Sequence, residues 1–188
     1  LGTAINVLGA RAGGLDVTLP DLNNLREKNN MARTQLEFID GIRNINAIWQ
    51  NWSSVTSINE TIATAIGQVM NSLNIIDLSG LYEDPSFNID IGIWDVSMVT
   101  DMSRMFNGAE SFNQDISGWD ISMVTNMSSM FHTAISFNSG IFELDANSQV
   151  NNMSSMFEGA ESFDQDIWDW YVSKVTDMNN MFKGAKSF

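Results

Sequence analysis

Two hydrophobic periodicities divide the chain near residue 77. Ahead of that point, apolar residues recur at steps of three and four from Leu36 to Leu73, which is the spacing of one face of an α-helix. At 1.5 Å per residue, a single helix over residues 21–73 would be roughly 80 Å long. An apolar stripe of that length has to be buried on other helices, so the pattern predicts a coiled-coil stalk. The positions expected to form its oligomer seam are Ile39, Ile42, Ile45, Ile48, Trp52, Val55, Ile58, Ile62, Ile66, Val69 and Leu73.

The seam indicates an oligomer but leaves its geometry open. Isoleucine-rich seams favour three or four parallel helices over two, so we expect a homotrimer. The three-residue steps between Leu36 and Ile48 depart from a strict heptad. Either the coiled coil is irregular, or the segment breaks near Gly41 into a hairpin.

The second periodicity is a tandem repeat. Residues 105–112 read Met-Phe-Asn-Gly-Ala-Glu-Ser-Phe, and related octapeptides begin at residues 130, 156 and 181. The first phenylalanines of successive copies are 25, 26 and 25 residues apart. A second block, Trp-Asp-Val-Ser-Met-Val-Thr, occupies residues 94–100 and has related copies from residues 119 and 170. One such unit cannot bury its Met, Phe and Trp side chains alone, so stacked units are expected to share one continuous core.

Each repeat predicts a short strand, a loop and a short helix. The threonine at the end of the Trp block can cap the free N–H groups of a helix that carries Met102, Met105 and Phe106 on one side. A glycine then follows where a left-handed residue commonly ends a helix, as at Gly108. Parallel strands are expected near residues 87–91, 112–116, 137–141 and 163–167.

These two blocks resemble the BspA-like leucine-rich repeats of mycoplasmal, other bacterial and some viral surface proteins. The resemblance covers roughly residues 87–188 and rests on Met-Phe-x-Gly-Ala-x-Ser-Phe-Asn-Gln-Asp-Ile and Trp-Asp-Val-Ser-x-Val-Thr. It implies a parallel-strand solenoid that is displayed outside a cell or on a virion, with adhesion or recognition as its role and no catalytic residues. The expected fold class is therefore mixed α+β: a long helical coiled-coil stalk followed by a leucine-rich-repeat solenoid of about 25-residue repeats.

The predicted domains follow from these patterns. Residues 1–20, with the glycine-rich stretch 9–14, are expected to form a flexible attachment segment, residues 21–76 the stalk, and residues 77–188 the solenoid. Residues 77 to about 93 read as a degenerate capping copy, and we expect the array to continue beyond residue 188. The copy that starts at residue 130 lacks the Trp block and contains one extra residue, so a bulge is expected there.

Charge narrows the range of partners. Residues 81–188 carry 16 acidic and 4 basic side chains, and the whole chain has a net charge of −14. A surface this acidic argues against nucleic acid, whose phosphates need Lys and Arg, and against charge-driven binding to an anionic membrane. The chain has no cysteine, and it has no apolar run long enough to span a bilayer.

Aspartates and one tryptophan are the candidates for binding chemistry. Asp90, Asp115 and Asp166 share one repeat position, where they either cap turns or hold Ca²⁺, which prefers oxygen ligands. Trp168 stands out of phase with the repeating tryptophans, and an exposed aromatic residue beside aspartates is typical of sugar-binding faces. The ligand-contact candidates are Trp168, Asp95 and Asp120.

No catalytic set accompanies these residues. The single histidine, His132, lies where other copies carry Asn, Glu or Lys, and it has no second histidine or nucleophile beside it, so we interpret it as a surface residue. The twelve methionines recur at the repeat spacing and are expected to pack in the core. The sequence thus predicts a protein that is not an enzyme and that needs no cofactor.

Our first functional prediction is a structural fibre or whisker of a phage particle. In its glycine and asparagine content the stalk resembles fibritin-type whiskers. The chain would be trimeric through the stalk, would attach to other virion or surface proteins through its N-terminus, and would display the repeats to a cell-surface protein or glycan. The alternative is a bacterial or mycoplasmal cell-surface adhesin with the same repeats. An enzyme that uses the array as an appendage would need a catalytic domain that these residues lack.

Overall fold

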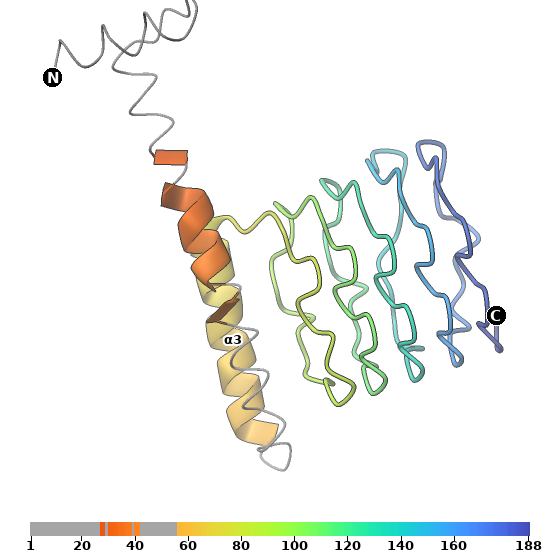
Figure 1. The fold of residues 1–188 in the computed structure, drawn as a ribbon, viewed down its shortest axis with the longest axis horizontal. Helices are drawn as coiled ribbons and strands as arrows, with labels where there is room; N and C mark the ends of the chain where they lie inside the picture. Colours follow the sequence, from red (N-terminus) through yellow and green to blue (C-terminus); the bar gives the residue numbers. More distant parts are fainter. Residues whose placement is uncertain (1–26, 29, 39, 42–55) are drawn as a thin grey trace, which may run out of the picture. The chain divides into compact units, whose positions relative to one another are not determined.

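The computed structural model describes residues 27–28, 30–38, 40–41 and 56–188 (Figure 1). The chain divides into two compact units, Leu1–Glu37 and Phe38–Phe188. Residues 27–28, 30–38 and 40–41 are helical. The second unit consists of helix α3, Thr56–Leu73, followed by a series of irregular coils. We call residues 75–188 the coil stack.

Helix α3 lies against the beginning of the coil stack. Ile66 and Met70 are one helical turn apart, so they share a face, and both are buried in the core of the stack. Asn74 ends the helix in the left-handed conformation, with a φ of 48°. The N–H of Ile75 then donates to the carbonyl of Met70 at 3.4 Å, which is the closure of a Schellman motif. The chain thereby turns directly from the helix into the first coil.

The coils lie side by side in chain order, and their register follows the sequence period (Figure 1). Isolated parallel bridges join one residue of each coil to its equivalent in the next. After each bridge residue, the next N–H donates to the bridge carbonyl of the following coil, as Leu78 does to Asp101 at 2.9 Å. The bridge residues are Asp77, Asp101, Asn126, Asn152 and Asp177.

The interior of the stack holds two columns of aromatic rings. Each coil contributes a close pair, such as Phe131 and Phe137, whose ring centroids lie 4.2 Å apart. The pairs also stack on their neighbours, and Phe131 lies 5.4 Å from both Phe106 and Phe157. Leucines of the first coil, such as Leu81, and methionines of the later coils surround the columns, and Met105, like these phenylalanines, is fully buried. Burial of this apolar surface is the main force that holds the coils together.

The predicted fold class is wrong in its local structure. The described residues contain no regular strand, only single bridges, and the expected short helices are turns. The residue three places after each bridge has a positive φ, for example 58° at Arg104 and 54° at Ser129, and a left-handed residue interrupts a helix at that point. Gly108 has a φ of 76°, but it ends a turn and not a helix.

Side chains replace strand pairing where strands were expected. The amide oxygen of Asn88 accepts the backbone N–H of Asn113 at 2.9 Å, and that of Asn113 accepts the N–H of Asn138 at 2.8 Å. The threonines work in a similar way, since Thr125 donates its hydroxyl to the carbonyl of Thr100 at 3.1 Å and caps no helix. Backbone groups are thus satisfied by ladders of polar side chains between coils.

The prediction of a long coiled-coil stalk is also wrong. The one complete helix that the structure describes, α3, has 18 residues, and Ile66 and Leu73 of the expected seam pack on the core of their own chain. Val69 is 40% exposed, and Ile58 and Ile62 lie on α3. The seam positions that fall outside the described residues are Ile39, Ile42, Ile45, Ile48, Trp52 and Val55.

Candidate recognition surface

An apolar groove of about 680 Å³ opens on the last two coils. We call it the Trp168 groove. It is lined by hydrophobic residues from both coils, with carboxylates and an amide at its edge. The residues used below are Asp164, Gln165, Asp166, Trp168, Trp170, Val172, Met178, Met181, Phe182 and Phe188.

The indole of Trp168 projects out of the coil stack. Its exposed fraction is 92%, whereas Trp94, Trp119 and Trp170 are buried. A turn fixes the backbone at this point, because the Asp166 carboxylate accepts the Trp168 N–H at 3.1 Å. The arrangement presents a large flat ring to a ligand while its backbone stays anchored.

The edge of the groove is built on the asparagine ladder. The N–H of Asp164 donates to the Asn138 side chain at 2.8 Å, and the Gln165 amide donates to the same Asn138 oxygen at 2.9 Å. Among the described residues, nothing donates to the carboxylate of Asp164. The edge therefore offers a hydrogen-bond acceptor beside an apolar lining.

Two lysines of the last coil pair with glutamates of the preceding coil. Lys183 forms an ion pair with Glu158 at 2.7 Å, and Lys186 forms one with Glu161 at 2.7 Å. The hydrogen bond from Lys183 is the first cause that lowers the pKa of Glu158. Both pairs are solvent-exposed and add little stability. They hold the ammonium groups of the two lysines against glutamates of the preceding coil.

The aspartates of the proposed metal row cap turns. Asp90 accepts the N–H of Gly92 at 3.0 Å, and Asp115 accepts that of Ser117 at 2.9 Å. The row is interrupted between Asp115 and Asp166 because Gly140 occupies the position of an aspartate. A Cβ atom on Gly140 would lie 2.6 Å from an Asp115 carboxylate oxygen. The part of the chain that the structure describes contains no group of three or more acidic, His or Cys side chains suited to a metal.

The other two ligand-contact candidates lie in equivalent turns. Asp95 accepts both the hydroxyl of Ser97, at 2.6 Å, and its N–H, at 3.0 Å. These bonds, the hydroxyl first, lower the pKa of the Asp95 carboxyl. Asp120 accepts the N–H of Ser122 and lines a small depression of about 190 Å³ beside Trp119. Neither aspartate is at the Trp168 groove.

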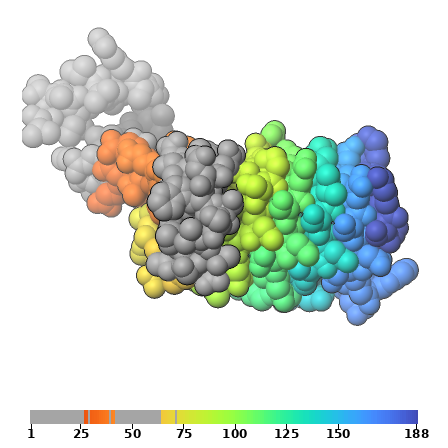
Figure 2. Space-filling model, turned by 90° about the horizontal axis from the view of Figure 1, so that it is seen from below, coloured from red at the N-terminus to blue at the C-terminus, as the bar shows by residue number. Residues whose placement is uncertain are grey.

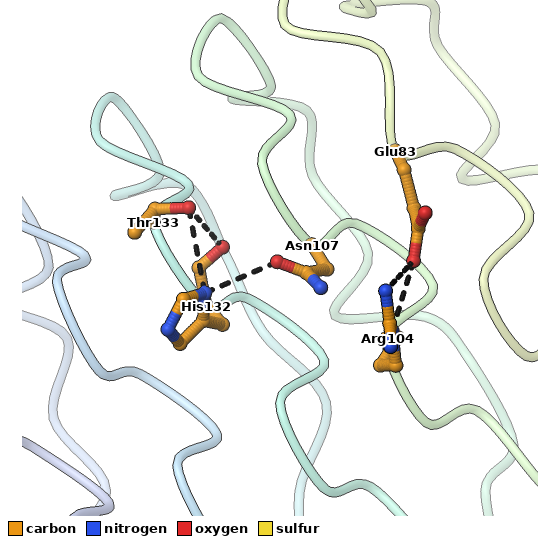
Figure 3. A network of polar contacts seen from close by, with 5 residues as sticks. All are labelled: Glu83, Arg104, Asn107, His132 and Thr133. Atoms are coloured by element: carbon orange, nitrogen blue, oxygen red, sulfur yellow. Dashed lines mark hydrogen bonds and ion pairs between the residues drawn. The ribbon is translucent and has the colours of Figure 1, made fainter.

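His132 belongs to a row of polar contacts between coils (Figure 3). Its Nδ1 lies 3.1 Å from the side-chain oxygen of Asn107, and Thr133 donates its hydroxyl to the His132 carbonyl at 2.7 Å. On the same row, Arg104 forms an ion pair with Glu83 at 2.8 Å. The His132–Asn107 and Arg104–Glu83 contacts tie adjacent coils together, and the Thr133 hydroxyl also lies 3.5 Å from Nδ1 of His132.

The extra residue in the copy after residue 130 is absorbed within one turn. Ser148 is buried, its N–H donates to the Asp145 carbonyl at 3.1 Å, and its hydroxyl accepts the Val150 N–H at 3.3 Å. The bridge between Asn126 and Asn152 is unaffected. The coils consequently form one uninterrupted row in the space-filling view (Figure 2).

Sequence reasoning missed three groups of the groove: Asp164, Phe182 and Phe188. The repeat assigns Phe188 to an interior column, yet it is 54% exposed. Its counterpart Phe163 is fully buried. The phase of the repeat predicts which positions face the interior, but it does not predict the exposed fraction of each copy.

Comparison with known proteins places the chain in a family without naming an activity. No curated protein and no solved structure gives a significant match. Within the described residues, no helix has the length and apolar character needed to cross a membrane. A family model matches residues 44–149 and 145–188, which is well over half of the chain. The chain belongs to the family described as "Mycoplasma protein of unknown function, DUF285".

Proposed function

We propose that this chain is a non-enzymatic recognition protein displayed at the surface of a Mycoplasma-type cell, and that the indole of Trp168 contacts its partner. The observation that carries the proposal is the 92% exposed indole of Trp168, whose backbone is anchored by a turn at Asp166. Exposed hydrophobic patches with polar edges are typical of interaction sites. The coil stack holds this face rigidly, since every coil is bonded to its neighbours.

The family and the resemblance to BspA-like repeats both support the cell-surface alternative over a phage fibre. The fold offers the fibre reading no support, because the helix that would have formed its stalk packs on the coil stack of its own chain. The partner is a cell-surface protein or glycan. Its binding face should be neutral or basic, because the chain carries a net charge of −14.

The test is adhesion of the purified full chain to cultured host cells, measured as bound protein against concentration. Trp168→Ala should reduce binding at least tenfold, because a large aromatic residue commonly dominates an interface. Tyr171→Ala is the matched control, since Tyr171 is 49% exposed three residues away and does not line the groove. Equal binding by both variants and the unaltered chain would remove Trp168 from the proposal. No saturable binding at all would remove adhesion to such cells.

A further inference from the structure

One lateral face of the first coils exposes apolar side chains at its turns. In the first coil, the N–H of Val99 donates to the carbonyl of Val96 at 2.8 Å, and this turn presents Met98, which is 49% exposed. Met123 is at the equivalent turn of the second coil and is 48% exposed. Ile93, in a neighbouring turn of the first coil, is 68% exposed. The apolar side chains of this face thus recur from one coil to the next.

The coils that carry this face are covered on both sides. On one side, Gly67 of α3 lies against the ring of Trp94. On the other side, the N–H of Tyr171 in the fourth coil donates to the carbonyl of Leu144 in the third at 2.7 Å. The exposure of the lateral face is therefore a property of the inner stack and not of either end.

A row of carboxylates crosses the same face. Asp95, Asp120 and Asp145 are 25 residues apart, and each accepts the N–H of the residue two places on. Among the described residues, nothing donates to the second carboxylate oxygen of Asp95 or Asp120. The pKa of Asp145 is lowered first by the hydrogen bonds from Asn147 and last by the charge of Lys174, with which it forms no ion pair. The row thus presents negative charge to the solvent.

A depression of about 190 Å³ lies beside the row, between the second and third coils. Its lining includes the buried side chains of Trp119 and Ile121 and the carboxylates of Asp120, Glu143 and Asp145. A surface of this kind fits a partner that carries apolar and basic groups together, because the apolar side chains would be buried and the charges would be complementary.

We propose that this lateral face, residues 93–98, 117–123 and 143–148, binds a basic amphipathic helix of a partner protein. The helix would lie along the stack and place one Lys or Arg over each coil. Its apolar side chains would cover Met98 and Met123, whose flexible side chains adapt well to a partner surface. The inference goes beyond the proposed function, because it makes no use of the exposed tryptophan.

The spacing of the row favours a helix over an extended segment. Hydrogen-bonded neighbouring chains lie about 5 Å apart, so three coils span about 10 Å. Successive turns of an α-helix rise by about 5.4 Å, so basic residues at i, i+3 or i+4, and i+7 keep step with the row. Same-side residues of an extended strand are about 6.7 Å apart and fall out of step by the third coil.

The experiment titrates the ¹⁵N-labelled full chain with an acetylated peptide that contains three copies of Lys-Ala-Ala-Lys-Leu-Ala-Leu. As a helix, this peptide carries its lysines on one face and its leucines on both flanks of that face. We expect saturable shifts of the amides of residues 95–98, 120–123 and 145–148. A peptide of the same composition with its lysines spread around the helix should bind about tenfold more weakly.

Two matched pairs of variants test the face. Asp120→Asn keeps the acceptor for the Ser122 N–H and removes only the charge, so it should weaken binding about threefold, as expected for an exposed ion pair. Glu110→Gln removes a charge outside the face and should leave binding unchanged. Met123→Ala should also weaken binding about threefold. Ile135→Ala, which shortens an exposed apolar side chain outside the face, should not.

Several results would overturn the inference. Equal affinities of the two peptides, or equal losses from Asp120→Asn and Glu110→Gln, would show that net charge alone attracts the peptide. Spermidine that reproduces the shifts at the same affinity would make the face a polyamine site. The absence of any saturable shift would remove the face altogether. Trp168→Ala should leave peptide binding unchanged, so Trp168-dependent cell binding with an inert peptide would reject this inference and leave the proposed function standing.

Discussion

At the scale of single residues, the same short polar side chains do the same work in every coil. Asp77, Asp101 and Asp177 each accept the N–H of the residue two places on, and Asn126 and Asn152 do the same with an amide oxygen. This position needs a side-chain oxygen that accepts a hydrogen bond, but it does not need a negative charge, because asparagine serves as well as aspartate. Much of the acidity of the stack therefore lies in aspartates that cap turns.

In the turn at Asp95, the hydroxyl of Ser97 should make the stability of the chain depend measurably on pH. The native pKa of Asp95 is lowered, so its turn adds stability above the ordinary carboxyl pKa of about 4 and loses it as the pH falls through the native value. Ser97→Ala should raise the pKa of Asp95, measured by carboxyl ¹³C shifts. The stability lost by this variant at pH 7 should disappear as the pH falls through the lowered native pKa of Asp95. Ser122→Ala, whose hydroxyl makes no bond to Asp120, is the control and should show no such pH-dependent difference.

Tyr82 carries a buried hydroxyl that has no partner among the described residues. Burial raises the pKa of this phenol well above its ordinary value, so the group stays neutral. The later coils place phenylalanine at this position, as at Phe106. Tyr82→Phe removes an unsatisfied polar group and should stabilise the chain by about 1 kcal/mol in chemical denaturation. A loss of stability of that size would show that the hydroxyl has a partner.

At the scale of elements, α3 shows how the same apolar stripe supports two different structures. Ile58, Ile62, Ile66, Val69 and Leu73 follow the spacing of a helix face, and the helix itself was predictable. The partner of that face was not, because a stripe that fits another helix also fits the end of a coil stack. Within α3, Gly67 lies against the ring of Trp94.

Gly67 is expected to be needed for that contact. A Cβ atom there would lie 2.8 Å from Cδ1 of the buried Trp94 ring. In an open helix, Gly→Ala stabilises by up to about 1 kcal/mol, but overpacking costs about 1–3 kcal/mol. Gly67→Ala should therefore destabilise the chain by about 1 kcal/mol, measured by urea unfolding. Gln68→Ala, on the exposed side of the helix, should change stability by less than about 0.5 kcal/mol. A more stable Gly67→Ala variant would show that α3 does not press on Trp94.

The repeats show where sequence reasoning succeeded and where it failed. The period and the interior phenylalanines were readable because apolar residues recur every 25 or 26 positions. Strands and helices were not, because Arg104 and Ser129 take a left-handed conformation that their residue types rarely adopt. The sequence pattern predicted that Asn113 lies in a strand, whereas its side-chain oxygen accepts the hydrogen bond from the next coil. At the site, Trp168 could be singled out because it is out of phase with the other tryptophans. The exposure of Phe188 could not be predicted, because its position in the repeat is the same as that of the buried phenylalanines.

At the scale of the whole second unit, the coil stack is nearly one-dimensional. Ring contacts link each coil only to its immediate neighbours, as Phe131 is linked to Phe106 and Phe157. Stability is then close to a sum of the coils and the interfaces between them. One end is covered by α3, and the other carries the Trp168 groove.

This coupling predicts that the cost of a core substitution depends on its place in the stack. Phe131 is fully buried between two other coils, so Phe131→Ala should destabilise the chain by about 3–5 kcal/mol, the range for large cavities in packed cores. Phe182→Ala makes the same chemical change in the last coil, where Phe182 is only half-buried, and should cost less than half as much.

The variants should also unfold differently in urea. Loss of the Phe131 contacts weakens both central interfaces, so the coils on either side should separate into two transitions by hydrogen exchange and circular dichroism. Phe182→Ala should keep one main transition, because the remaining coils stay coupled. Equal costs for the two substitutions, or a single sharp transition for Phe131→Ala, would show that the stack folds as one cooperative body.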